Sequence, residues 1–148
     1  MIILEGTDAV GKTSTIRELK KENIICEDRS KEMISKYMLA EYDIAFRAKK
    51  YQEYLKKQEC FIIFLTNSDK EELLRRVHQR TKISDFDLQA PEYNQMYQDT
   101  FDYMEENNMR EGKLFLVDVT GLSLEEQVQK VKQKILSLKS QSKSMKRL

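Results

Sequence analysis

The sequence is poor in the residues that cross-link chains or bind metals: its 148 residues include two cysteines and one histidine. Cys26 and Cys60 both fall in segments that we predict to be buried strands, so reduced core thiols are a simpler interpretation than a disulfide framework. His78 stands on a charged helical segment without a cysteine–histidine cluster, which gives no support for a zinc site. We expect His78 to be structural or exposed rather than catalytic.

The sequence also lacks a large charge of one sign and a long apolar run. Its formal net charge is +1, which gives no electrostatic argument for a nucleic-acid or membrane partner. The longest fully apolar run is Phe61 to Leu65, far short of the ~20 residues of a membrane-spanning helix. The N-terminus resembles a strand followed by a glycine loop rather than a signal peptide. We therefore expect a cytoplasmic protein without membrane partners, and the sequence leaves a homodimer open.

Short apolar runs alternate with segments of helical periodicity. We predict buried strands at residues 1–4, 23–28, 60–65 and 114–119. Between them we predict helices at residues 13–22, 30–58 (one long broken helix or two), 70–80 and 92–107. This alternation is typical of a parallel sheet covered by helices on both faces, so we predict a three-layer α/β fold with about four parallel strands.

The end of the chain carries a further predicted helix. Ser123 and Glu126 resemble a capping box that opens this helix. The helical spacing places four apolar residues inward: Val128, Val131, Ile135 and Leu136. We assign residues 1–138 to a single domain, and we expect residues 139–148, which contain lysines among serines, to be a disordered basic tail.

Residues 6–13, Gly-Thr-Asp-Ala-Val-Gly-Lys-Thr, fit the phosphate-binding pattern G-x-x-x-x-G-K-[ST] between a predicted strand and a predicted helix. Backbone N–H groups of such a loop converge on phosphate oxygens, and the helix N-terminus adds partial positive charge. Lys12 can reach the β- and γ-phosphates of ATP, and the Thr13 hydroxyl can ligate Mg²⁺. The predicted nucleotide-binding residues of the loop are Gly6, Thr7, Asp8, Ala9, Val10, Gly11, Lys12, Thr13 and Ser14.

Two charged groups lie at positions where a second substrate could bind. Asp28, at the end of the second predicted strand, can hold Mg²⁺ or accept a proton from an attacking hydroxyl, and Arg29 can clamp an anionic acceptor. Arg76 and Arg80 share one helix face and lead into a polar loop ending near Pro91, for which we expect a lid over the phosphates. The alternative for both groups is ordinary solvated surface charge.

One further pattern points to a different class of protein. Residues 118–121, Asp-Val-Thr-Gly, match the D-x-x-G motif of GTPases. The match comes late in the chain and no N-K-x-D follows it, so we set a GTPase aside.

Several of these segments together resemble thymidylate kinases. Glu5 to Thr13 is similar to their phosphate loop, which often reads E-G-x-D-x-x-G-K-[ST], and Asp28-Arg29 resembles their D-R pair. Residues 61–80 resemble their strand, acid-rich turn and E-x-x-L-x-R-x-x-x-R helix. Residues 114–135 resemble the last strand and helix of nucleotide kinases in general. The resemblance covers most of the chain in order, and the glycine loop is its most specific part.

The resemblance implies a nucleoside monophosphate kinase that transfers phosphate from ATP, with Mg²⁺, to a (deoxy)nucleoside monophosphate. It implies that Asp8 contacts the acceptor sugar, Arg29 the acceptor phosphate, and Arg76 the donor adenine. Arg80 would contact the phosphates, in place of the arginine that some members carry where Ala9 stands. The resulting catalytic set is Lys12, Asp28, Arg29 and Arg80, with Thr13 and Asp28 at the metal.

The chain is shorter than thymidylate kinases, which have a further strand, helices and an R-E-P-like acceptor motif before the D-R pair. Here only the 14 residues from Thr15 to Asp28 separate Ser14 from Arg29. Two alternatives therefore stay open. One is a deoxynucleoside kinase that phosphorylates a 5′-hydroxyl with Glu27 or Asp28 as base, since Asp28-Arg29-Ser30 also resembles the E-R-S of that family. The other is an ATP-binding module that has lost its acceptor site.

Overall fold

A four-stranded parallel sheet forms the centre of the molecule. The computed structural model describes residues 1–38, 41–80, 83 and 88–146, without the side chains of Asp8 and of residues 142–146. The strands are β1 (Ile2–Glu5), β2 (Glu27–Asp28), β3 (Phe61–Thr66) and β4 (Leu114–Asp118), in the order β2-β1-β3-β4. The register pairs Ile3 with both Glu27 and Ile62, and Ile62 with Leu114. The predicted α/β class and parallel sheet are confirmed.

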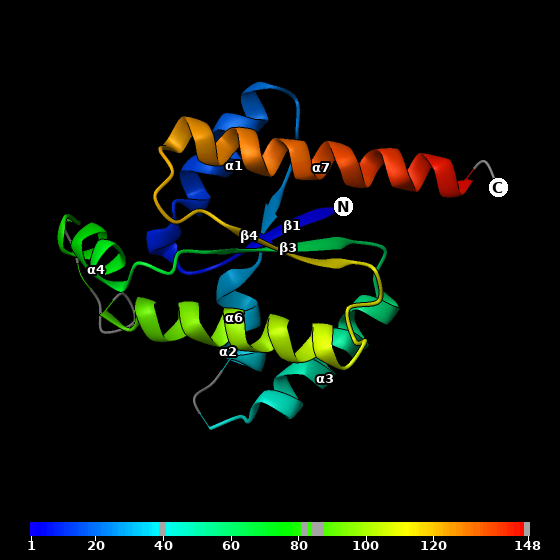
Figure 1. Ribbon diagram of the computed structural model, residues 1–148, viewed down its shortest axis with the longest axis horizontal. Helices are drawn as coiled ribbons and strands as arrows, with labels where there is room; N and C mark the ends of the chain where they lie inside the picture. The colour runs from blue at the N-terminus through cyan, green and yellow to red at the C-terminus, as the bar shows by residue number, and fades with distance from the viewer. Residues whose placement is uncertain (39–40, 81–82, 84–87, 147–148) are drawn as a thin grey trace.

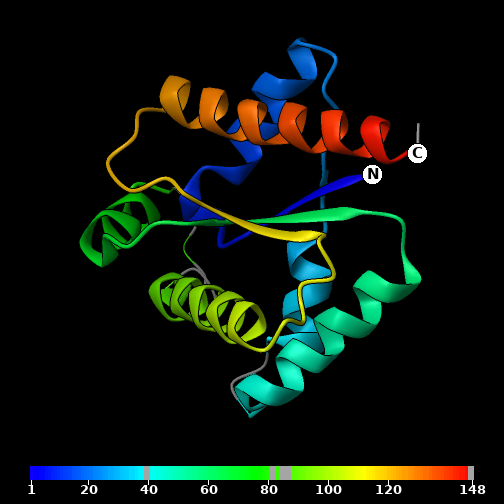
Figure 2. The same ribbon diagram turned by 45° about the vertical axis from the view of Figure 1, so that its right-hand side comes forward.

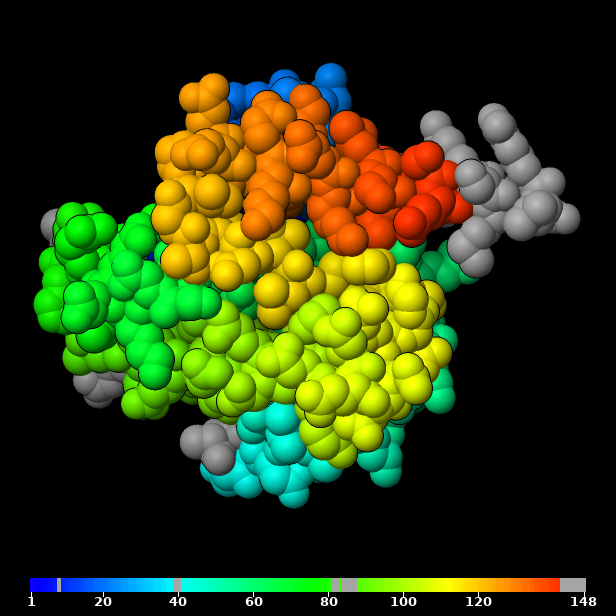
Figure 3. Space-filling view, in the orientation of Figure 1, coloured from blue at the N-terminus to red at the C-terminus, as the bar shows by residue number. Residues whose placement is uncertain are grey.

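Helices cover both faces of this sheet (Figure 1). The helices are η1 (Asp8–Val10, a 3₁₀ turn), α1 (Lys12–Lys21), α2 (Ser30–Tyr37), α3 (Ile44–Lys57), α4 (Lys70–His78), α6 (Ala90–Glu106) and α7 (Leu124–Lys146). Helices α1 and α7 lie on one face, whereas α2, α3 and α6 lie on the other (Figures 1 and 2). Helix α4 follows the carboxyl end of β3, and with α6 and α7 it forms much of the surface visible in Figure 3.

The core has two halves because successive strand residues point to opposite faces of a sheet. Leu4 of β1 and Leu65 of β3 pack with residues of α1 and α7, such as Leu19 and Val131. The strand residues that point to the opposite face form the other half, where Ile3, Ile62 and Phe64 pack with Tyr51, Leu55 and Tyr97. Cys26 and Cys60 are buried free thiols, as predicted.

Strand β2 is shorter than predicted. Of the predicted residues 23–28, only Glu27 and Asp28 pair with β1, and both are exposed. Ile24 and Cys26 are buried, but Ile25 between them is 64% exposed, so alternate side chains of this segment reach the core. The next predicted segment, 30–58, forms two helices, and the side chain of Asp43 caps the second by accepting a hydrogen bond from Phe46 N.

Helix α7 corrects two expectations. Leu136 is 48% exposed, so its predicted inward orientation is wrong, and Leu138 is buried instead, completing the series Val128, Val131, Ile135 and Leu138. The helix also continues through Lys146, over most of the segment for which we expected a disordered tail. No proline or glycine follows Gly121 to end it. Among the described helices, α7 included, none is long and apolar enough to cross a membrane.

The predicted capping box at the start of α7 is present. Ser123 Oγ accepts a hydrogen bond from Glu126 N at 3.2 Å, and Ser123 N donates to Glu126 Oε1 at 3.1 Å. Ser123→Ala should lower the free energy of unfolding by about 1 kcal/mol, because one helix N–H loses its partner. Urea denaturation measures this loss. The matched control is Ser137→Ala at an exposed interior position of the same helix, which should be neutral or slightly stabilising. Equal losses in both variants would contradict the capping role.

Candidate functional site

The segment from Gly6 to Thr13 lies at the point where the strand order reverses. β2 pairs with one side of β1 and β3 with the other, so the carboxyl end of β1 is a topological switch point. Parallel sheets bind their ligands outside the carboxyl ends of the strands at such points. The fold therefore places the loop where a ligand site is expected.

Both glycines of the loop are required by its geometry. A Cβ at Gly6 would lie 2.7 Å from the carbonyl oxygen of Leu65, which is closer than van der Waals contact allows. Gly11 has φ +83, in the left-handed region, and a Cβ there would lie 3.1 Å from Gln127 Nε2. Between them η1 turns the chain, and α1 begins directly after Gly11. The loop thus leads from a buried strand straight into a helix N-terminus.

Lys12 is the centre of this arrangement. It is fully buried, and its Nζ donates a hydrogen bond to the Gly6 carbonyl at 2.9 Å. The same nitrogen lies 3.3 Å from Asp28 Oδ1, whose side chain is 38% exposed. Asp28 Oδ1 also accepts from Ser30 N at 3.0 Å, and Ser30 Oγ accepts from Gly6 N at 3.2 Å. The structure thus brings together two predicted catalytic residues, Lys12 and Asp28, that are 16 positions apart (28 − 12).

Gln127 of α7 supports the loop from behind. Its Nε2 donates to the Val10 carbonyl at 2.9 Å and to Thr15 Oγ1 at 2.8 Å, and Thr15 Oγ1 donates to the Gly11 carbonyl at 2.9 Å. Gln127 is buried, so these bonds are shielded from water. Sequence analysis missed this residue. The only local sign that Gln127 has a structural role is that it is a polar residue next to Val128, which was expected to face inward.

The basic end of α4 reaches the loop, as predicted. Arg76 Nη1 donates to the Ala9 carbonyl at 3.1 Å, and its Nη2 donates to Glu72 Oε1 at 2.6 Å. Arg76 and Arg80 line a cavity of about 290 Å³, together with Ala9, Gly11, Ser14, Leu124 and Gln127. Arg75 and His78 are exposed on the same helix, and exposure is one of the two outcomes expected for His78.

Arg29 is not brought to Lys12. Its Nε donates to Glu27 Oε2 at 2.9 Å and its Nη1 to the Tyr54 hydroxyl at 2.7 Å, so the guanidinium faces α3. The hydrogen bond to Glu27 raises the pKa of Arg29. Strand β2 ends at Asp28, and the backbone bends at Arg29 (φ −118, ψ 17) to begin α2, so the two adjacent side chains reach different partners.

Other predicted features are exposed or lie outside the described part of the structure. Thr13 is exposed on the first turn of α1. The side chain of Asp8 is outside the described part, as are residues 81–82 and 84–87 of the expected lid.

Glu5 at the end of β1 is a further buried acid that sequence analysis did not single out. Its Oε1 accepts hydrogen bonds from the hydroxyls of Tyr51 at 2.8 Å and Tyr97 at 3.5 Å. Its Oε2 is buried without a hydrogen-bond partner in the described residues. Burial raises the pKa of Glu5 from 4.5 to about 8, against the opposing effects of the Tyr51 hydrogen bond and the Lys12 charge. Glu5 is therefore protonated at neutral pH, and the loop has a neutral acid beneath it.

This raised pKa makes stability depend on pH. Between pH 5 and pH 8 the native state keeps a proton on Glu5 that the unfolded chain has released, so the free energy of unfolding falls as the pH rises. Glu5→Gln cannot titrate. The stability of the wild type relative to this variant should therefore decrease across the window, by at most about 1.4 kcal/mol per pH unit. Urea denaturation at several pH values measures the difference. The exposed Glu41→Gln serves as control, and a wild-type-to-Glu5→Gln difference that is constant with pH would contradict the raised pKa.

Fold and site together define a three-layer α/β protein with a glycine loop and a buried lysine at the switch point of its sheet. No protein-family model matches the chain, and a search of curated proteins gives no match.

Proposed function

We propose that this protein is a nucleoside monophosphate kinase that transfers the γ-phosphoryl group of ATP. The observation that carries the proposal is the buried Lys12, whose ammonium lies between the Gly6 carbonyl and the Asp28 carboxylate at the end of β1. Gly6 and Asp28 pair the buried ammonium, but buried ion pairs are often no more stabilising than apolar residues of the same volume. Stability alone therefore does not require a lysine here, and contact with incoming phosphates supplies a reason for one.

The loop supplies the other parts of a phosphate site. The N-terminal N–H groups of α1 are free of helical partners and carry partial positive charge. The left-handed Gly11 directs the chain into this helix, and Gln127 and Thr15 hold the loop carbonyls from behind. A helix N-terminus held in this way is a ready-made binding site for phosphate.

The cavity beside Arg76 offers a place for the donor nucleotide. Its lining combines the loop residues Ala9 and Gly11 with Arg76 and with Leu124 of α7. An apolar side chain on one side and a planar guanidinium on the other suit a purine ring. Arg80 lines the same cavity and is suited to the phosphates.

Mg²⁺ fits this site as a companion of ATP. The described residues contain no group of three or more metal-binding side chains, and Mg²⁺ at nucleotide sites takes only one or two protein ligands beside phosphate and water. The exposed Thr13 hydroxyl and the Asp28 carboxylate would hold it. When bound, the ion would neutralise charge on the transferred phosphate. Lys12 would stabilise the same charge from the protein side, and Asp28 would orient the attacking oxygen.

The proposal predicts that Lys12 is essential for turnover. Lys12→Ala should lower kcat/KM by about 100-fold or more, because the transition state loses a charge partner. A coupled assay of ADP release measures the loss, with circular dichroism to show that the variant is folded. Lys20→Ala, an exposed lysine on the same helix, should leave kcat/KM unchanged. A folded Lys12→Ala protein with near-normal turnover would contradict the proposal.

A second candidate, phosphorylation of a nucleoside 5′-hydroxyl, is favoured by the position of Arg29. Glu27 and Tyr54 hold the guanidinium that was expected to bind the acceptor phosphate, whereas the Asp28 carboxylate lies at the loop. A carboxylate near Lys12 suits a hydroxyl acceptor as base, and this acceptor needs no arginine.

Matched acceptors separate the two candidates. If a monophosphate is the acceptor, dTMP should give higher kcat/KM than thymidine, and Arg29→Gln should raise KM about tenfold for dTMP only, because it removes a charge-assisted bond. Tyr54→Phe, which removes one hydrogen-bond partner of Arg29 but keeps Arg29 and its contact with Glu27, should not raise this KM. Thymidine as the better acceptor, with no effect of Arg29→Gln, would favour the nucleoside kinase.

Matched pairs of nucleoside and monophosphate should be screened across all common bases. ATP binding without acceptor-dependent ADP release for any base would favour an ATP-binding module.

A further inference from the structure

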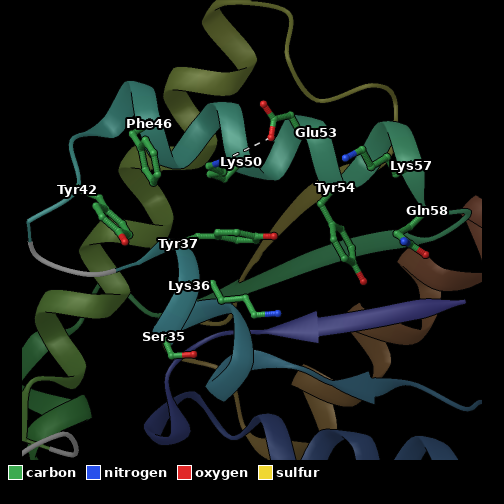
Figure 4. A pocket seen from close by; sticks show the side chains of 10 residues that line it. All are labelled: Ser35, Lys36, Tyr37, Tyr42, Phe46, Lys50, Glu53, Tyr54, Lys57 and Gln58. Atoms are coloured by element: carbon green, nitrogen blue, oxygen red, sulfur yellow. Dashed lines mark ion pairs between the residues drawn. The ribbon is translucent and has the colours of Figure 1, made fainter.

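A groove between α2 and α3 forms a cavity of about 580 Å³, which is within the usual size of small-molecule sites. It shares no lining residue with the cavity beside the glycine loop. Figure 4 shows Lys36 and Tyr37 of α2 extending toward Tyr54 of α3. The groove is therefore a separate hollow, which the loop chemistry does not use.

Aromatic rings dominate the apolar part of the groove. Tyr42 and Phe46 lie at one end with their ring centroids 4.4 Å apart, and Tyr37 and Tyr54 line the middle. Tyr37 is fixed from behind by edge contact with the buried Tyr51, at 5.4 Å between centroids. Rings held in this way offer π-faces on which a planar heterocycle can stack.

The charges of the groove are mostly positive. Three lysines, Lys36, Lys50 and Lys57, line it with one acid, Glu53. Lys50 Nζ lies 3.7 Å from Glu53 Oε2, and Lys36 Nζ lies 3.0 Å from Glu32 Oε1 outside the lining. Lys57 is exposed at the end opposite Tyr42 and Phe46. An anion entering at this end meets an excess of cations.

We propose that this groove is a second binding site, which takes a nucleoside monophosphate. The base stacks at the Tyr42–Phe46 end, and the phosphate lies between Lys36 and Lys57. One ammonium, Lys50 Nζ, lies over the Phe46 ring at 5.3 Å from its centroid, whereas Lys36 and Lys57 lie toward the other end, so the groove matches a ligand that has a planar part and a compact anion. The volume of about 580 Å³ is of the size that a mononucleotide fills.

Residue-resolved NMR of the ¹⁵N-labelled full chain tests this site apart from the glycine loop. Titration with AMP should shift the amide signals of residues 35–37 and 42–58 in a saturable way. Adenosine, which lacks the phosphate, should bind there about tenfold more weakly. The affinity for AMP should fall with added salt. Signals of residues 6–14 report any loop binding separately, so failure of the proposed kinase activity does not affect the outcome.

Matched variants identify the groove as the cause of these shifts. Lys57→Ala should weaken AMP binding at residues 35–58 about tenfold, because it removes a cation from the lining. Lys56→Ala removes an exposed lysine outside the lining from the same helix, and should change the affinity less than twofold. Tyr42→Leu, which keeps apolar volume but loses the ring, should weaken AMP and adenosine alike.

Four results would overturn the proposal. The first is no saturable shift in residues 35–58 with AMP, and the second is an equal effect of Lys56→Ala and Lys57→Ala. The third is binding of a ten-nucleotide single strand at this site far more tightly than AMP, which would indicate a nucleic-acid surface. The fourth is concentration-dependent shifts of these residues without nucleotide, together with dimer formation in sedimentation, which would assign the groove to a second copy of the chain.

Discussion

The structure depends on one buried positive charge, the ammonium of Lys12. An ammonium removed from water must be paired and hydrogen-bonded, and here the Gly6 carbonyl and the Asp28 carboxylate meet that requirement. The carbonyl is available because the chain turns sharply after β1, which only glycine allows beside Leu65. The carboxylate is available because β2 pairs in register with β1 and ends at Asp28. Loop, edge strand and the first turn of α2 are thus tied to the same charge.

The end of β2 connects the two sites that we propose. Asp28 faces Lys12, whereas Arg29 faces the other way and donates to Tyr54, which lines the α2–α3 groove. The backbone bend at Arg29, directly after β2, separates these adjacent side chains. In the described part of the chain no strand pairs with the outer side of β2, so this edge of the sheet is open.

The parts of the fold that local patterns determine were predictable from sequence. The parallel sheet followed from apolar runs between helical segments, and the capping box of α7 followed from Ser123 and Glu126. Contacts between distant segments were not predictable, as Gln127 shows by bonding Val10 across 117 positions. Leu136 was misassigned although the helical spacing of Val128, Val131 and Ile135 continues to Leu138, which is the buried residue. The contacts of Arg29 with Glu27 and Tyr54 were likewise not predictable from its place in the sequence.

The central claim is that the loop from Gly6 to Ser14 binds the phosphates of ATP, and amide NMR with Mg²⁺-ATP tests it most directly. We predict saturable shifts that are largest at the N–H groups of residues 9–14, at the end of β1 and the start of α1. In Lys12→Ala, read against its own nucleotide-free spectrum, the saturable shifts at residues 9–14 should be weaker. ATP binding that leaves these amides unperturbed, or no binding at millimolar ATP, would contradict the account.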